Sequence, residues 1–132
     1  NLGNRRFRDV VGDLGPDLGR PLVARGAAYA DYDGDGDLDL LVTTNGGRAH
    51  LFRNDGGNRN GYLRVALVGA PSNRDGIGAR VTVTLPDGAR LSRLVHTGSS
   101  YCSQSEPTLT FGTGTAGRIE RVDGETLRSP TG

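Results

Sequence analysis

Five aspartates within nine residues carry the clearest chemistry in this sequence. The segment 31–39 follows the pattern D-x-D-x-D-G-x-x-D, and its acidic residues are Asp31, Asp33, Asp35, Asp37 and Asp39. Carboxylates packed this closely repel one another, by about 1 kcal/mol per pair in water and by more at a lower dielectric constant. A bound divalent cation removes that repulsion, so the spacing predicts a metal-binding loop.

The same spacing favours Ca²⁺ over Mg²⁺. Calcium accepts about six to eight oxygen ligands, and a loop with acidic side chains at alternate positions, followed by a turn glycine and a backbone carbonyl, wraps around it. Asp31, Asp33 and Asp35 would supply side-chain oxygens, Asp37 its carbonyl oxygen and Asp39 the closing carboxylate. Magnesium prefers a strict octahedral site that retains several waters. A solvated acidic turn without an ion is the alternative.

The surroundings of this loop differ from those of an EF-hand. Loop position 12 is Val42 instead of glutamate, and the flanking segments 26–30 and 38–43 have the composition of β-strands. We therefore expect a cation loop that joins two strands.

The composition predicts an all-β chain. Glycine accounts for 22 of the 132 residues, and no segment sustains the apolar period of a helix. Glycine-rich turns at 45–47 and 86–88 predict hairpins and therefore antiparallel sheets. Strands are expected at 7–11, 26–30, 38–43, 49–53, 62–68, 79–85, 90–97, 108–111 and 119–122.

Several function classes are not expected. The net charge of +1 gives no electrostatic basis for nucleic-acid binding, and no apolar run reaches the length of about 18 residues that a membrane-spanning helix needs. No nucleophile, base and orienting group form a recognisable set, so we do not expect an enzyme. The single cysteine, Cys102, is expected as a small strand residue with a buried or half-buried side chain. His96 is the local base for the alternative nucleophilic role.

Two further features have alternative interpretations. The segment Ser72–Gly78 is expected to form an Asx-type turn in which Arg74 and Asp75 pair, and the alternative is an anion site or a second cation site. Arginines alternate with apolar residues at 64–67 and 90–95, which predicts a solvated arginine face. A surface for acidic glycans or a neighbouring subunit is the alternative for these arginines.

A short internal echo suggests a boundary near Asn58. Residues 1–4 resemble residues 54–58, and a repeat of about 50 residues fits one four-stranded propeller blade. The run RGAAYADYDGDGDLDLLV at 25–42, with LFRN at 51–54, resembles an FG-GAP/VCBS repeat, the calcium-loop blade of integrin-α-type propellers. This resemblance covers residues 1–57.

Residues 58–132 resemble the ASPIC/UnbV domain, on NRNGYLRV at 58–65, SNRDGIGARV at 72–81 and GSSY at 98–101. After Phe111–Gly114 the chain departs from that family's Trp-Pro-x-Gly turn, because it contains no tryptophan. Together the two resemblances imply one propeller-blade-like antiparallel sheet with an Asp-rich calcium loop, followed by a small antiparallel β-sandwich or barrel-like domain.

A single blade leaves unpaired strand edges that something must cover. The second half of the chain, neighbouring blades of a longer chain, or identical copies could cover them, and a repeating contact that does not close produces a filament. The sequence therefore predicts a calcium-stabilised structural or adhesive module, extracellular or at the cell surface. One form of this prediction is a self-assembling subunit of a filament or tube. The alternative is a glycan- or protein-binding C-terminal module of a larger secreted propeller protein.

Overall fold

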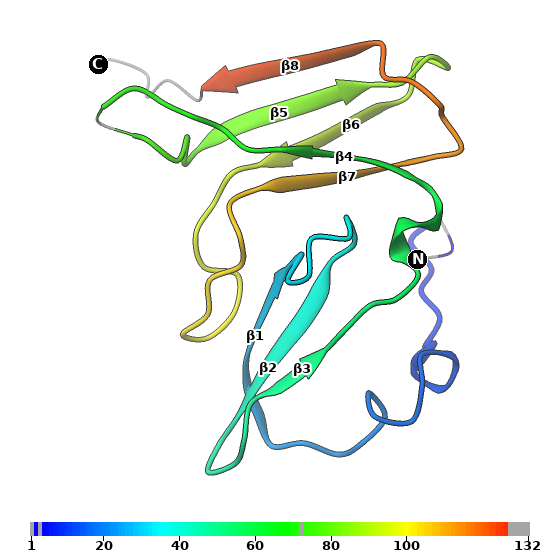
Figure 1. Ribbon diagram of the computed structural model, residues 1–132, viewed down its shortest axis with the longest axis vertical. Coiled ribbons are helices and arrows are strands. Elements are labelled where there is room, and N and C mark those ends of the chain that lie inside the picture. The colour runs from blue at the N-terminus through cyan, green and yellow to red at the C-terminus, as the bar shows by residue number, and fades with distance from the viewer. Residues whose placement is uncertain (1, 3, 72, 127–132) are drawn as a thin grey trace.

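The computed structural model describes residues 2, 4–71 and 73–126 and is built almost entirely from antiparallel strands (Figure 1). Within these residues the helical elements are two single turns, η1 (Val11–Asp13) and η2 (Gly57–Arg59). None of the helices there has the length and apolar character needed to cross a membrane. The expectation of an all-β fold is confirmed.

The N-terminal half forms a three-stranded meander of β1 (Ala24–Ala30), β2 (Asp39–Thr44) and β3 (His50–Phe52). The aspartate loop joins β1 to β2. The expected glycine turn joins β2 to β3, and Gly46 adopts the positive φ of 72° that this turn requires. In Figure 1 the aspartate loop is the cyan end of this sheet that points toward β4 and β7.

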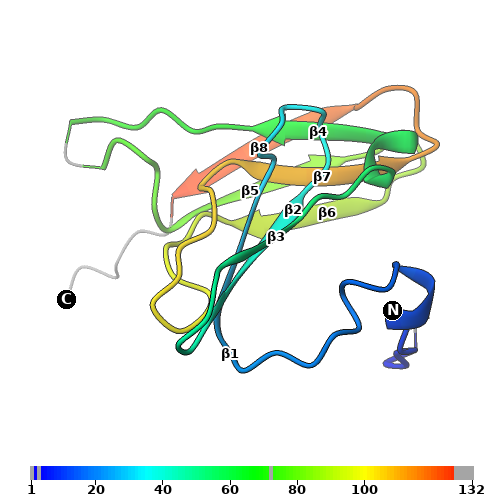
Figure 2. The same cartoon turned by 60° about the horizontal axis from the view of Figure 1, so that its bottom comes forward.

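The C-terminal half forms two small sheets. One pairs β4 (Gly61–Val65) with β7 (Leu109–Gly114), and the other places β5 (Ala79–Thr84) between β6 (Arg90–Leu94) and β8 (Arg121–Thr126). Figure 2 shows β4 and β7 crossing over the β6–β5–β8 sheet. These strands form an open two-layer sandwich, and the described residues contain no closed barrel. The predicted hairpin at 86–88 joins β5 to β6, whereas the β4–β7 and β5–β8 pairings join segments far apart in sequence.

The hydrophobic core lies between the two C-terminal sheets. Phe111 of β7 is 1% exposed and belongs to the same cluster as Val81 and Val83 of β5, which are 1% and 0% exposed. Partly buried side chains of β4 and β6, such as Leu63 and Leu91, pack against this cluster. All buried hydrophobic side chains among the described residues occur at or after Ala79. The N-terminal sheet therefore depends on interactions other than a core of its own.

The predicted strand at 7–11 does not form. The Asp9 carboxylate accepts a hydrogen bond from the Val11 amide at 2.9 Å, and this side-chain turn starts η1 in place of an extended segment. Phe7 is 79% exposed and has no neighbouring strand to pair with in the described part of the chain. The N-terminal sheet consequently has three strands there, not the four expected for a blade.

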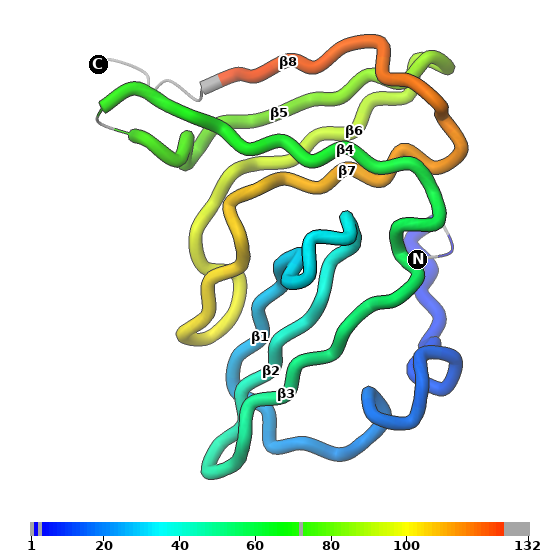
Figure 3. Tube along the Cα trace, in the orientation of Figure 1, coloured from blue at the N-terminus to red at the C-terminus, as the bar shows by residue number. Residues whose placement is uncertain are grey.

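The loop between β6 and β7 covers the outer edge of β1. The Ala27 amide donates to Ser100 Oγ at 3.2 Å and the Tyr29 amide donates to Ser105 Oγ at 3.1 Å. The Glu106 amide in turn donates to the Tyr29 carbonyl at 3.1 Å. The tube view in Figure 3 shows this yellow loop descending from the sandwich alongside β1. The C-terminal half thus satisfies the strand edge that a lone blade would leave open.

The expectation for Cys102 is wrong. Cys102 is exposed and lies in a turn of the β6–β7 loop, with φ 47° in the left-handed region. This placement leaves it outside every strand.

Gly26 provides a direct test of how the two halves fit together. A Cβ at Gly26 would lie 2.6 Å from the Tyr101 carbonyl oxygen and 2.3 Å from Ser103 Oγ, so the β6–β7 loop would have to move. We expect Gly26→Ala to lower the free energy of unfolding by about 1–3 kcal/mol, the usual cost of overpacking, in urea denaturation. Gly124→Ala in β8 is the matched control, since nothing lies within 4 Å of that Cβ. Equal effects of the two substitutions would contradict the contact.

Candidate metal centre

Three of the five predicted aspartates come together in the loop between β1 and β2. Carboxylate oxygens of Asp31, Asp33 and Asp39 all lie within 4.8 Å of one another. Asp31 follows β1 and Asp39 begins β2, and the register pairs Ala30 with Asp39, so the hairpin itself brings the first and last ligands together. Asp35 and Asp37 lie outside this group of three.

Backbone amides of the loop fold inward onto the carboxylates. The Gly36 amide donates to Asp31 Oδ2 at 3.1 Å and the Tyr32 amide donates to Asp39 Oδ2 at 2.9 Å. Gly34 and Gly36 have φ of 77° and 97°, which side chains rarely adopt, and these conformations turn the chain around the carboxylates. The loop is therefore organised by its own hydrogen bonds.

The donor set fits a hard cation. The Asp31 side chain is 1% exposed, and its Oδ1 is buried with no hydrogen-bond partner, although an ionised carboxylate needs one or a cation in such a position. Asp33 and Asp39 add further carboxylate oxygens at the same point. Oxygen-only donors are the ligands that calcium and magnesium select.

Asp37 has a different environment from the other four aspartates. Its Oδ2 accepts hydrogen bonds from the amides of Gly57 at 2.9 Å and Asn58 at 3.3 Å, while its Oδ1 is buried without a partner. Burial raises the pKa of Asp37 above its ordinary value of 3.8, and the nearby Asp35 carboxylate raises it further, against the lowering effect of the two amides. The Asp37 carboxylate thus ties the loop to the start of η2, and the predicted role of its carbonyl oxygen remains a prediction.

Residues from the end of β3 to β4 hold the loop from outside. The Asn54 amide donates to Asp39 Oδ1 at 2.8 Å. Asn58 Nδ2 donates to the Asp35 carbonyl at 3.1 Å, and the Tyr62 hydroxyl donates to the same oxygen at 3.4 Å. Asn58, where the boundary was predicted, lies between the first and second halves of the chain and contacts the aspartate loop.

Two charged residues at this site were not predicted as part of it. Arg64 of β4 forms ion pairs with both Asp31 and Glu106, and Glu106 lies in the β6–β7 loop. The alternation at 64–67 predicted a solvated arginine, but the Arg64 side chain is only 26% exposed. No local signal links residues 64 and 106 to residue 31, because only the tertiary fold brings them together.

In the residues described, the segment before β5 turns, but not through the predicted Asx-type bond to an amide two residues on: the Asn73 side chain instead bonds Ile77, four residues on. Asn73 Oδ1 accepts the Ile77 amide and Asn73 Nδ2 donates to the Ile77 carbonyl, both at 2.9 Å. Ser72 lies outside the described residues. The expected pair between Arg74 and Asp75 is not among the ion pairs of the described part of the chain. The turn is thus held by the asparagine side chain.

Sequence comparison adds a family to this geometry. Residues 69–123 match the family described as ASPIC and UnbV. This ASPIC/UnbV segment contains β5, β6 and β7 and ends inside β8, so it includes Glu106 and most of the core, while Arg64 lies just before it. The resemblance of residues 1–57 to an FG-GAP/VCBS repeat stays a prediction.

The chain is also similar to cartilage acidic protein 1. It is 38% identical over 96 residues to the proteins from Homo sapiens and Mus musculus, and 36% identical to the one from Xenopus tropicalis. Each alignment covers 67% of this chain, and therefore extends beyond the ASPIC/UnbV segment into residues before 69. The aligned part spans only 14% of each relative.

The raised pKa of Asp37 predicts a pH dependence of stability in calcium-free protein. As the pH rises, Asp37 loses its proton at a lower pH in the unfolded state than in the native state, so the native state binds more protons over that range. The contribution of Asp37 to the free energy of unfolding therefore falls as the pH rises above 3.8 and through the higher native pKa. Asp37→Asn removes this contribution while keeping an oxygen for the Gly57 and Asn58 amides. We expect a shallower pH dependence of the urea midpoint in chelator for this variant. Asp17→Asn, at an exposed ion pair, is the control, and superimposable curves for Asp37→Asn and the parent would contradict the expectation.

Proposed function

We propose that this chain is a non-enzymatic, calcium-stabilised structural or adhesive module of a larger extracellular protein. The observation that carries the proposal is the buried Asp31 Oδ1, which has no partner and belongs to a side chain within 4.8 Å of two other carboxylates. A cation at that point would satisfy the orphan oxygen and remove the repulsion within the group.

Calcium suits this site better than magnesium. Asp31, Asp33 and Asp39 offer several carboxylate oxygens in one loop, and carbonyl oxygens of the loop could complete a coordination sphere of about six to eight ligands. Magnesium would require a stricter octahedron with retained waters. At the millimolar calcium found outside cells, even a weak site of this kind would be occupied.

The distribution of buried groups supports a stabilising role for the ion. The sandwich has a hydrophobic core, whereas the buried residues described in the N-terminal sheet and its loop are glycines and aspartates: Gly26, Gly36, Asp37 and Asp39. An ion bound there would contact both the end of β1 and the start of β2. It would stabilise the folded state, because any ligand that binds only the folded state does so.

The comparisons support a place in a larger protein. The aligned region is 14% of each relative, and the name of those relatives refers to cartilage, a tissue rich in extracellular matrix. Because the β6–β7 loop already covers the edge of β1, self-association or contact with a neighbouring blade would use the other side of the sheet, at β3.

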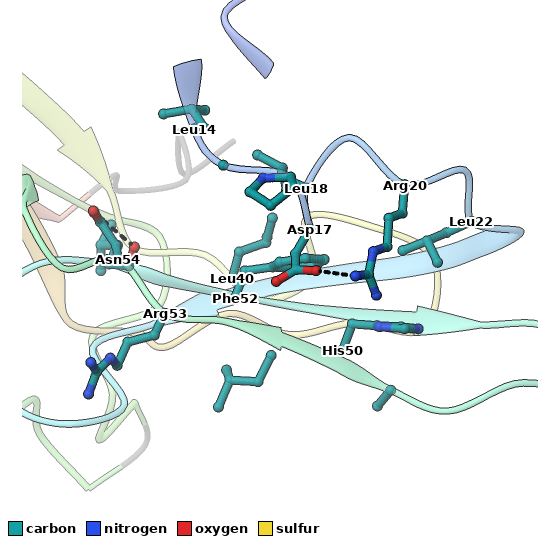
Figure 4. A pocket seen from close by; sticks show the side chains of 15 residues that line it. Leu14, Asp17, Leu18, Arg20, Leu22, Leu40, His50, Phe52, Arg53 and Asn54 are labelled. Atoms are coloured by element: carbon teal, nitrogen blue, oxygen red, sulfur yellow. Dashed lines mark hydrogen bonds and ion pairs between the residues drawn. The ribbon is translucent and has the colours of Figure 1, made fainter. Parts of the chain in front are cut away.

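A second candidate function is binding of a glycan or protein partner at β3. A groove of about 710 Å³ lies between residues 14–22 and strands β2 and β3 (Figure 4). The His50 and Phe52 rings stack there with centroids 6.2 Å apart, and Arg20, which pairs with Asp17 at 2.9 Å, lines the opposite side. Aromatic faces beside polar groups suit such ligands.

The calcium proposal predicts a cation-dependent melting temperature. At a calcium concentration about ten times Kd, binding adds about 1.4 kcal/mol of stability. That gain corresponds to a rise in Tm of roughly 3–8 °C for a domain of this size, measured by calorimetry against a chelator. We expect Asp33→Asn to reduce the rise strongly and an equal concentration of magnesium to produce a smaller one.

Asp55→Asn is the matched control for that experiment. Asp33 and Asp55 both contact Arg53, at 3.9 and 2.7 Å, but Asp55 is not in the carboxylate group. The Asp55 variant should keep the full calcium response. An unchanged Tm of the parent protein in saturating calcium would refute the calcium proposal.

A further inference from the structure

Arg64 connects the aspartate loop to the second half of the chain. Its Nη1 donates to Asp31 Oδ2 and its Nη2 donates to Glu106 Oε2. The three side chains are largely enclosed, with exposed fractions of 26% for Arg64, 1% for Asp31 and 15% for Glu106. Charge pairs removed from water in this way are screened by salt much less than surface pairs.

Glu106 reaches the same point by two further hydrogen bonds. Its Oε1 accepts the Asp31 amide at 3.3 Å, and its own amide donates to the Tyr29 carbonyl at 3.1 Å. Glu106 is therefore fixed at the end of β1, beside the first residue of the loop. Asp31, Arg64 and Glu106 form an ion triad, drawn from the loop, from β4 and from the β6–β7 loop.

The two oxygens of Asp31 have separate roles. Oδ2 accepts hydrogen bonds from Arg64 and from the Gly36 amide, whereas Oδ1 is buried without a partner. The Asp31 carboxylate thus belongs to the group of three and is at the same time paired with a guanidinium. A cation on Oδ1 and the guanidinium on Oδ2 would share the same negative charge and repel each other.

We propose that Arg64 and Glu106 set the calcium affinity of the loop, with Arg64 lowering it and Glu106 raising it. This inference rests on the proposed function. The positive charge of Arg64 offsets part of the carboxylate charge and keeps the affinity in the weak range of extracellular modules, which the charge count of a site controls. Glu106 lies outside the loop and adds one negative charge near the site, which raises the calcium affinity.

The same arrangement couples ion binding to the contact between the two halves. Calcium competes with Arg64 for the charge of Asp31. Calcium binding therefore weakens the Arg64–Asp31 ion pair, and the ion pair weakens calcium binding by the same factor, because thermodynamic linkage is reciprocal. Loss of Arg64 leaves Asp31 and Glu106 uncompensated, and calcium would then contribute more to stability than it does in the parent.

Calcium titrations of charge variants test the inference. The experiment is isothermal titration calorimetry of the full chain at constant ionic strength, with CaCl₂ as the probe. We expect Arg64→Gln to lower Kd and Glu106→Gln to raise it, each by about three- to tenfold, as expected for removing one unit charge near a divalent ion. The double variant should return close to the parent Kd.

Two controls separate charge from structure. Arg64→Lys keeps the positive charge without the fork that spans two carboxylates, and it should stay within about twofold of the parent. Arg121→Gln removes an exposed arginine that pairs with Asp123 on β8, at the same cost in net charge, and should leave Kd unchanged. Circular dichroism in chelator identifies any variant that does not fold.

Opposite shifts in Kd for Arg64→Gln and Glu106→Gln would support the inference. Weaker calcium binding in both variants would mean that the triad only positions the loop. An unchanged Kd in both would mean that the triad does not act on the ion. Either result overturns this inference and leaves the proposed function standing. Binding in neither the parent nor the variants overturns the proposed function as well. Should Arg64→Gln not fold, Glu106→Gln decides, because an equal or lower Kd there contradicts the inference.

Discussion

The structure depends on how carboxylates in one short loop are compensated. Asp39 and Asp37 are 2% and 5% exposed, and burying an ionised carboxylate is expensive unless hydrogen bonds or opposite charges surround it. The Tyr32 and Asn54 amides donate hydrogen bonds to the Asp39 carboxylate. The Gly57 and Asn58 amides donate hydrogen bonds to the Asp37 carboxylate. These bonds constrain the path of the chain from β3 to β4, so the loop determines where the second half begins.

This constraint explains the different character of the two halves. The sandwich folds around apolar side chains of β5 and β7, with Phe111 and Val83 at its centre. The three-stranded sheet instead gains its order from polar contacts with the loop on one end and with Ser100 and Ser105 along one edge. Its order therefore depends on hydrogen bonds to buried carboxylates, whereas the sandwich is built around an apolar cluster.

The match of residues 69–123 to the ASPIC and UnbV family covers most of the sandwich, but the contacts described above cross its limits. Glu106 lies within the matched segment and binds Arg64 and Asp31, which both lie before it. The ASPIC/UnbV segment of this chain thus packs directly against a preceding aspartate loop. Similarity to cartilage acidic protein 1 that extends before residue 69 agrees with treating the two parts together.

The sequence alone determined the features that depend on neighbouring residues. Strand-like runs bounded by turn residues predicted a segment overlapping each observed strand, and the aspartate spacing located the loop. They also predicted one strand that does not form, at 7–11, where Asp9 turns the chain. Only the tertiary structure decided which strands pair across the chain, that β1 is covered by the β6–β7 loop, and that Arg64 turns inward. Those outcomes depend on contacts between residues far apart in sequence, such as Asp31 and Glu106. A local pattern of residue types contains no information on such distances, because they are set by packing of the whole chain.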